Sequence, residues 1–238
     1  MIKNFISVLI FIFVQDDKKI ANELEKGTQQ PTFKFSDLGK VFKNKYVYLQ
    51  GLVVFAGYTV FWTNYYYGGH METNFGITPV TVGTIMVAVL WMRPIGGVVG
   101  GFLADKIGKS ITIAGALIGA AICLTLLSIL PKTLPVAILG GLVIITGLFL
   151  YVIRGTYWSL LGQSKIDVAI MGTAIGVISF IGYLPDIILP KLNTVLWNSF
   201  GNEGGYKAYF IVSMVVGLVG AVVAMIYKKI HASENTGN

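Results

Sequence analysis

Residues 93–109 read RPIGGVVGGFLADKIGK, and they join one long apolar run to the next. The glycines at 96, 97, 100 and 101 form two small-xxx-small pairs, which allow helix backbones to approach closely in lipid. The apolar run stops at Asp105, an acid that is costly within hydrocarbon and is therefore expected at the membrane interface. Gly108 permits the tight turn that two antiparallel helices need. The stretch thus predicts two membrane-spanning helices joined by a short charged loop.

The composition also indicates a membrane protein. The chain has 238 residues, of which 55% are hydrophobic and 12% are charged, whereas soluble domains carry about 25% charged residues. Its formal charge is +7, but the lysines lie between and at the ends of the apolar runs, as the orientation rule for membrane proteins requires. No nucleic-acid-binding motif is present. We therefore expect membrane lipid as a partner and no nucleic acid.

Six apolar runs after residue 45 are each long enough to cross about 30 Å of hydrocarbon at about 1.5 Å per residue. The connections 68–77, 131–133 and 190–205 separate some of them, and the last is rich in turn-forming Asn and Gly. We predict an all-α membrane protein in which residues 46–230 form one bundle of six transmembrane helices. The predicted spans are 46–67, 78–101, 110–130, 134–161, 169–189 and 206–227.

Two segments precede this bundle and a short tail follows it. Residues 1–14 hold an apolar run that is short for a span, which needs about 20 residues. It resembles a signal peptide without a small-residue cleavage site, or the end of a longer helix, and we interpret it as a partial transmembrane helix. Residues 15–45 contain seven lysines and a helix-capping sequence at Ser36-Asp37-Leu38, which predicts a cytoplasmic linker. The polar end of the chain, with 231–238 as a cytoplasmic tail, is expected to be loose.

The distribution of lysines predicts the orientation of the bundle. With the 15–45 segment inside, the inner segments hold twelve lysines and the outer ones hold three. The positive-inside rule therefore places both ends of the six-helix bundle in the cytoplasm.

The loop between the second and third spans carries a recognisable pattern. Gly101, Asp105, Lys106, Gly108 and Lys109 resemble the signature loop of the major facilitator superfamily (MFS), and such a motif carries weight only between two spans, as here. The alternative is an ordinary polar turn with lysines on the cytoplasmic side. The resemblance implies one six-helix half of a twelve-helix secondary transporter in the plasma membrane, which moves a small solute by alternating access.

The order of segments implies the C-terminal half. A partial span, a lysine-rich linker and six helices resemble helix six, the central loop and helices seven to twelve of a complete member. Residues 154–161 and 172–186 resemble helices ten and eleven of sugar-phosphate-permease-like members, although Gln163 stands where those relatives often have an acid. The implied partner is a second six-helix half, either a separate chain or one missing from this sequence. The resemblance also implies that Asp105 steadies the outward-facing state against a helix N-terminus of that half.

Apart from Lys207 at the outer end of the last span, Arg93, Arg154 and Asp186 are the charged residues within the predicted spans, and such residues are functional candidates by default. Either arginine could bind an organic anion through its planar guanidinium group. Arg93 could instead extend to the interface and brace the loop beside Asp105, and Arg154 could pair with an acid on another helix. Asp186 follows the helix-breaking Pro185, and it could take up a coupling proton, gate the outer mouth, or simply mark the boundary.

Aromatic residues supply the other candidates for a substrate cavity. Tyr58, Trp62 and Tyr65 recur at spacings of four and three, so they share one helix face, with Asn64 beside them. Tyr157, from the second family-like patch, is predicted to join them. The alternative is an aromatic belt at the membrane interface.

Enzyme chemistry is not indicated. Cys123 is the only cysteine and cannot form an intramolecular disulfide, and His70 and His231 show no metal-ligand spacing. No nucleophile–base–acid pattern is present, so we expect no catalysis, metal or cofactor. The main rival to a transporter is a non-transporting membrane subunit that associates with a partner through its glycine-rich helix faces.

Overall fold

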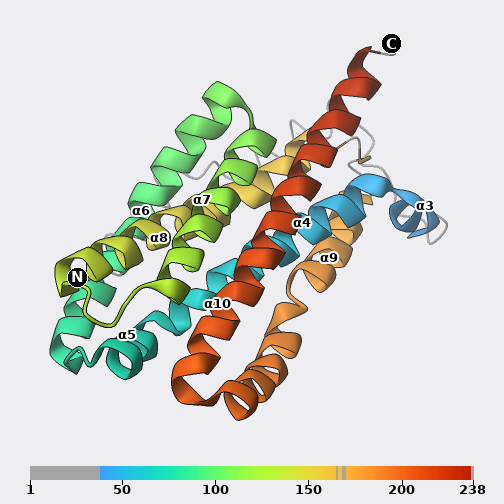
Figure 1. Ribbon diagram of the computed structural model, residues 1–238. Coiled ribbons are helices and arrows are strands. Elements are labelled where there is room, and N and C mark those ends of the chain that lie inside the picture. The colour runs from blue at the N-terminus through green and yellow to red at the C-terminus, as the bar shows by residue number, and fades with distance from the viewer. Residues whose placement is uncertain (1–37, 165, 168–169, 237–238) are drawn as a thin grey trace, which may run out of the picture.

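The computed structural model describes residues 38–164, 166–167 and 170–236, and this part of the chain is helical with no strand. The predicted partial span 1–14 and most of the predicted linker lie outside the described residues. Figure 1 shows the helices packed side by side, with the C-terminal arm of α10 crossing α4. The elements are α3 (Leu38–Lys43), α4 (Lys45–Trp62), η2 (Thr63–Tyr65), α5 (Tyr67–Phe75), α6 (Pro79–Ile107), α7 (Lys109–Ile129), α8 (Val136–Thr156), η3 (Tyr157–Gln163), α9 (Met171–Gly182) and α10 (Pro185–Thr236).

The prediction of an all-α membrane protein is confirmed. Within the described ranges, four helical stretches are long and apolar enough to cross a membrane: Pro79–Ile107, Lys109–Ile129, Val136–Gln163 and Met171–Glu234. The last stretch contains both the fifth and the sixth predicted spans. It is not one straight helix, because α10 is interrupted at Gly201 (φ 69°, ψ −177°). Figure 1 shows the chain reversing direction there. The first predicted span is α4, whose 18 residues continue into η2.

Gly201 and its neighbours explain this reversal. Its positive φ is a conformation that glycine adopts readily. Immediately beyond the turn the two arms of α10 touch, since a Cβ atom built on Gly205 would lie 2.6 Å from the Trp197 ring. The Trp197 and Tyr206 rings are 4.8 Å apart, edge to face. The arms therefore form an antiparallel pair.

The predicted outer connection 68–77 is largely helical. Residues 68–77 form most of α5, which ends at Gly76 in the left-handed conformation (φ 65°). The ring of His70 is fully buried and donates a hydrogen bond from Nε2 to the Leu127 carbonyl (3.2 Å). Asn74 donates to the Glu203 carbonyl (3.1 Å). These tertiary contacts stabilise a short helix that its own sequence would not predict.

The charged ends of two helices extend beyond the predicted apolar segments. The second predicted span, 78–101, lies within α6, and the helix continues through the family-like motif to Ile107. The C-terminal tail, predicted to be loose, is helical as far as Thr236. Glu234 forms an ion pair with Lys45 (2.5 Å) and accepts a hydrogen bond from the Tyr46 hydroxyl (2.7 Å). This link to the start of α4 explains why the tail stays ordered.

One glycine pair from residues 93–109 forms the contact between α6 and α8. A Cβ atom added at Gly96 would lie 2.7 Å from Tyr151 Cβ and 3.0 Å from the Val152 nitrogen. At Gly100 it would lie 3.0 Å from Thr156 Cγ2. Gly101, in contrast, faces open space. The close approach expected from the sequence is thus made by Gly96 and Gly100, which we call the α6–α8 seam.

Helix α4 is the centre of the bundle and uses different faces for different neighbours. Ala56 and Val60 face the second arm of α10, where Gly220 and Gly217 leave room for them. Gly57 faces Ile153 of α8, and a Cβ atom there would approach it to 2.7 Å. A third face of α4 packs on α9, where Gly51 meets Ile181 and Val54 meets Gly182, and the same face carries Tyr58 and Trp62.

Candidate functional site: a polar and aromatic cluster beside α4

Asp186 lies at the centre of the candidate site. Its Oδ1 atom accepts hydrogen bonds from the Tyr58 hydroxyl and from Trp62 Nε1, each 2.9 Å long. These donors are 128 and 124 residues away along the chain. Asp186 is exposed on its open side, so its carboxylate is oriented without being covered.

The break between α9 and α10 positions this carboxylate. Helix α9 ends at Gly182 and α10 begins at Pro185, which places Asp186 in the first turn of α10. Proline suits the first helical position, because the N–H of any residue there has no acceptor within the helix and its absence costs nothing. A carboxylate in the first turn is stabilised by the helix dipole. The prediction that Pro185 breaks the helix is confirmed.

Arg154 is the second charged member. Its guanidinium carbon lies 4.3 Å from the centroid of the Phe61 ring and 5.8 Å from that of Tyr58. This is the geometry of a cation–π contact. Arg154 is exposed, and it forms no ion pair with an acid in the described part of the chain. The pairing with an acid on another helix is thus not made among these residues.

Arg93 approaches the same region from α6. Arg93 precedes Gly96 on α6 by three residues, and Gly96 contacts Tyr151 of α8. The Tyr151 ring also packs edge to face against Phe61, with centroids 5.9 Å apart. Tyr151 belongs to the α6–α8 seam, so the seam holds the two arginine-bearing helices together. Arg93 is exposed and makes no ion pair with an acid in the regions the structure describes.

The other aromatic candidates differ in exposure. Tyr65 is 64% exposed and packs against Trp62, with centroids 5.4 Å apart. Asn64 has a buried Oδ1 atom without a hydrogen-bond partner in the described residues. Tyr157 is 2% exposed, beneath Gly57 of α4. Tyr157 therefore packs in the core against α4, whereas Tyr65 lies on the surface of the cluster.

The family-like loop lies apart from this cluster, at the far end of α6. Gly108 ends α6 with φ 98° and ψ 143°, a backbone conformation that favours glycine. Lys109 donates a hydrogen bond from Nζ to the Ser159 carbonyl (3.1 Å), which ties the loop to η3. Asp105 and Lys106 are exposed. The loop therefore presents Asp105 on a surface that the described residues leave open.

Sequence reasoning did not select three aromatic members of the cluster. These are Phe61, Tyr151 and Tyr183, the last of which packs edge to face on Tyr58 with centroids 4.8 Å apart. The sequence does contain a pattern that could have identified two of them. Tyr151 and Tyr183 precede the charged candidates Arg154 and Asp186 by three residues, a spacing that places both side chains on one face of a continuous helix. Among the described residues no group of three or more metal-ligating side chains occurs.

The cluster combines two guanidinium groups, one carboxylate, hydroxyl and indole donors, and aromatic rings on an exposed face. Such a set can bind a small polar solute, with the arginines as anion ligands and the rings as stacking surfaces. The fold and the charged residues in its long apolar helices define a polytopic α-helical membrane protein. The sequence matches the Major Facilitator Superfamily over residues 4–190, so the chain belongs to that family.

Two curated relatives agree with this assignment. The inner membrane protein YqcE of Escherichia coli strain K12 is 22% identical over 97% of this chain and 55% of the relative. The inner membrane protein YihN of the same strain is 27% identical over 93% of this chain and 53% of the relative. The chain thus spans about half the length of the curated relatives it matches. No solved structure matches it significantly.

Proposed function

We propose that the chain forms one half of a secondary active transporter and supplies a binding surface for a small organic anion. The observation that carries this proposal is the contrast between the charged groups of the cluster. Asp186 receives two hydrogen bonds from the protein, whereas Arg154 lies over two aromatic rings and forms no ion pair with a carboxylate in the described regions. An unpaired cation within a membrane-spanning helix is costly, and an anionic solute would compensate it.

The arrangement favours an anion that also carries a polar or cyclic part. Arg154 and Arg93 would bind the negative charge, and Tyr58, Trp62 and Tyr65 would contact the rest of the solute. In this proposal Asp186 couples or gates binding, because protonation would weaken the hydrogen bonds that it accepts from Tyr58 and Trp62.

The exposed face of α6 supports a second half as partner. Few residues of α6 are buried, and large apolar side chains such as Trp91, Val98 and Phe102 are 65–74% exposed. Asp105 lies exposed on the same helix. A second six-helix body would cover this face and offer Asp105 a positive helix N-terminus. The two bodies would then rock about the solute in alternating access.

The proposed orientation keeps both ends of the bundle in the cytoplasm. It rests on the excess of inner lysines. The relatives are named inner membrane proteins, which supports a plasma-membrane location.

Tryptophan fluorescence of the purified chain tests anion binding directly. Trp62 donates a hydrogen bond to Asp186, and Tyr58 contacts both Asp186 and Arg154. We expect glucose 6-phosphate or succinate to change the emission of the wild type, and neutral glucose to leave it unchanged. Arg154→Gln should abolish the response and Arg154→Lys should weaken it, because lysine lacks the planar fork. Lys132→Gln, which removes an exposed charge elsewhere, is the matched control.

The same experiment separates the rival function. A non-transporting subunit would use the α6 face to bind its partner, but it would have no need of an anion site. An unchanged response in Arg154→Gln, or no response to any anion, contradicts the transporter proposal. Anion uptake by cells that also express a complementary six-helix half would then be the test of flux.

A further inference from the structure

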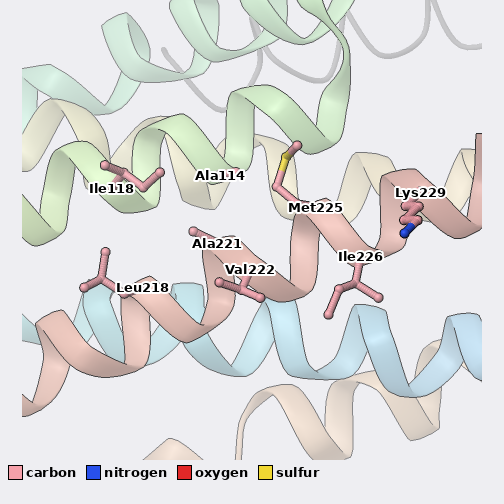
Figure 2. Close-up of a pocket in the computed structure, with 8 residues that line it drawn as sticks. All are labelled: Ala114, Ile118, Leu218, Ala221, Val222, Met225, Ile226 and Lys229. Carbon is pink, nitrogen blue, oxygen red and sulfur yellow. The ribbon is translucent and has the colours of Figure 1, made fainter.

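A groove of about 550 Å³ runs between α7 and the second arm of α10. It is lined by Ala114 and Ile118 of α7 and by residues of α10 from Leu218 to Lys229. Every lining residue except Lys229 is apolar. Figure 2 shows Lys229 at one end of this row, with Leu218 and Ile118 at the other. The groove therefore has the amphipathic character of a lipid: a long apolar body with a cation at one end.

The second arm of α10, which forms one wall of the groove, packs on the opposite side of α4 from the polar cluster. Ala56 faces the second arm of α10 through Gly220, whereas Tyr58 bonds to Asp186. Two residues along a helix correspond to a rotation of about 200°, because each turn contains about 3.6 residues. A second half that covered the cluster would leave the groove uncovered, so its natural surroundings are the lipids of the bilayer.

The dimensions of the groove match one leaflet. From Leu218 to Lys229 the helix rises about 16 Å at about 1.5 Å per residue, and half of the hydrocarbon core is about 15 Å thick. The Lys229 ammonium thus lies about one acyl-chain length from the inner end of the groove. It is exposed and forms no ion pair in the described part of the chain. Lys228 is equally exposed but does not line the groove.

From this geometry we propose that the groove binds a single anionic phospholipid of the leaflet on the C-terminal side. One acyl chain lies along the apolar wall of α7 and α10, and the Lys229 ammonium contacts the headgroup phosphate. Basic positions between transmembrane helices attract anionic headgroups for the same electrostatic reason. The exposure of the groove to lipid rests on the proposed function, in which a second half covers the cluster, whereas the lipid contacts themselves involve no residue of the cluster.

Native mass spectrometry of the detergent-purified chain, titrated with palmitoyl-oleoyl phosphatidylglycerol or phosphatidylcholine, tests the headgroup contact. We expect phosphatidylglycerol to bind about fivefold more tightly, which corresponds to about 1 kcal/mol for one lysine near the headgroups. Lys229→Gln should remove this preference, and Lys228→Gln should keep it. Equal effects of the two substitutions, or no preference in the wild type, would overturn the proposal.

A second pair of variants tests the apolar wall. Val222 lines the groove and Val219 lies outside it, and both are exposed, at 59% and 58%. We expect Val222→Trp to fill the groove and release phosphatidylglycerol, while Val219→Trp retains it. Displacement of the lipid by millimolar inorganic phosphate would identify a simple anion site instead. A dimer mass that Val222→Trp abolishes would identify a second copy of the chain as the occupant, and either result would refute lipid binding.

Discussion

Replacing Gly96 by alanine should push α6 and α8 apart, because the new methyl group would lie 2.7 Å from Tyr151 Cβ and 3.0 Å from backbone atoms of α8. Backbone atoms cannot move aside as the end of a side chain can. Overpacking of this kind costs about 1–3 kcal/mol, and the better helix propensity of alanine offsets about 0.5–1 kcal/mol. We expect a net destabilisation of about 1–2 kcal/mol.

The control for this substitution is Gly101→Ala. Gly101 lies on the same helix and in the same sequence motif, but a Cβ atom there would meet nothing within 4 Å. Its free energy of unfolding should stay unchanged or rise by about 0.5–1 kcal/mol. The pair therefore separates the effect of the seam from that of helix propensity.

Cys123 provides the assay. It is the only cysteine of the chain and is 6% exposed, so a thiol-reactive fluorescent dye should label it when the bundle opens. For a chain of this size about 1 kcal/mol shifts the melting temperature by about 2–4 °C. Gly96→Ala should melt about 2–8 °C below the wild type. Equal melting of Gly96→Ala and Gly101→Ala would refute the close contact at the seam.

Three further predictions concern other parts of the molecule. Asp186→Ala should shift the emission of Trp62, because the indole N–H loses its acceptor; an unchanged spectrum would contradict that hydrogen bond. Burial lowers the pKa of His70 from 6.5 to about 4. The stability held by neutral His70 is therefore fully present above pH 6.5 and lost as the pH falls toward 4, by at most about 3 kcal/mol; His70→Gln should flatten this part of the melting-temperature profile, and a flat wild-type profile would exclude it. Tyr227→Phe removes the buried hydrogen bond to the Leu160 carbonyl (2.9 Å) and should destabilise the chain by about 1 kcal/mol, with wild-type melting as the contrary result.

The features that the sequence alone predicts are those that depend on local chemistry. Long apolar runs require helices in a membrane, because every backbone polar group must be satisfied within the segment. The helix break at Pro185 and the turn at Gly108 follow from the backbone preferences of proline and glycine. The motif around Asp105 identifies the family before any contact is known. These properties need no knowledge of which helices are neighbours.

The tertiary structure alone decides which of these residues meet. Tyr58 and Trp62 reach Asp186 because α9 packs on α4 and the break before Pro185 places the first turn of α10 beside that helix. Equivalent-looking residues are likewise separated by packing: Gly96 is in contact while Gly101 is open, and Tyr65 is exposed while Tyr157 is buried. A helix presents side chains on every face, and only its neighbours determine which face becomes core, site or lipid contact. The physical reason is that side-chain burial depends on contacts between residues far apart in sequence, which the local pattern does not record.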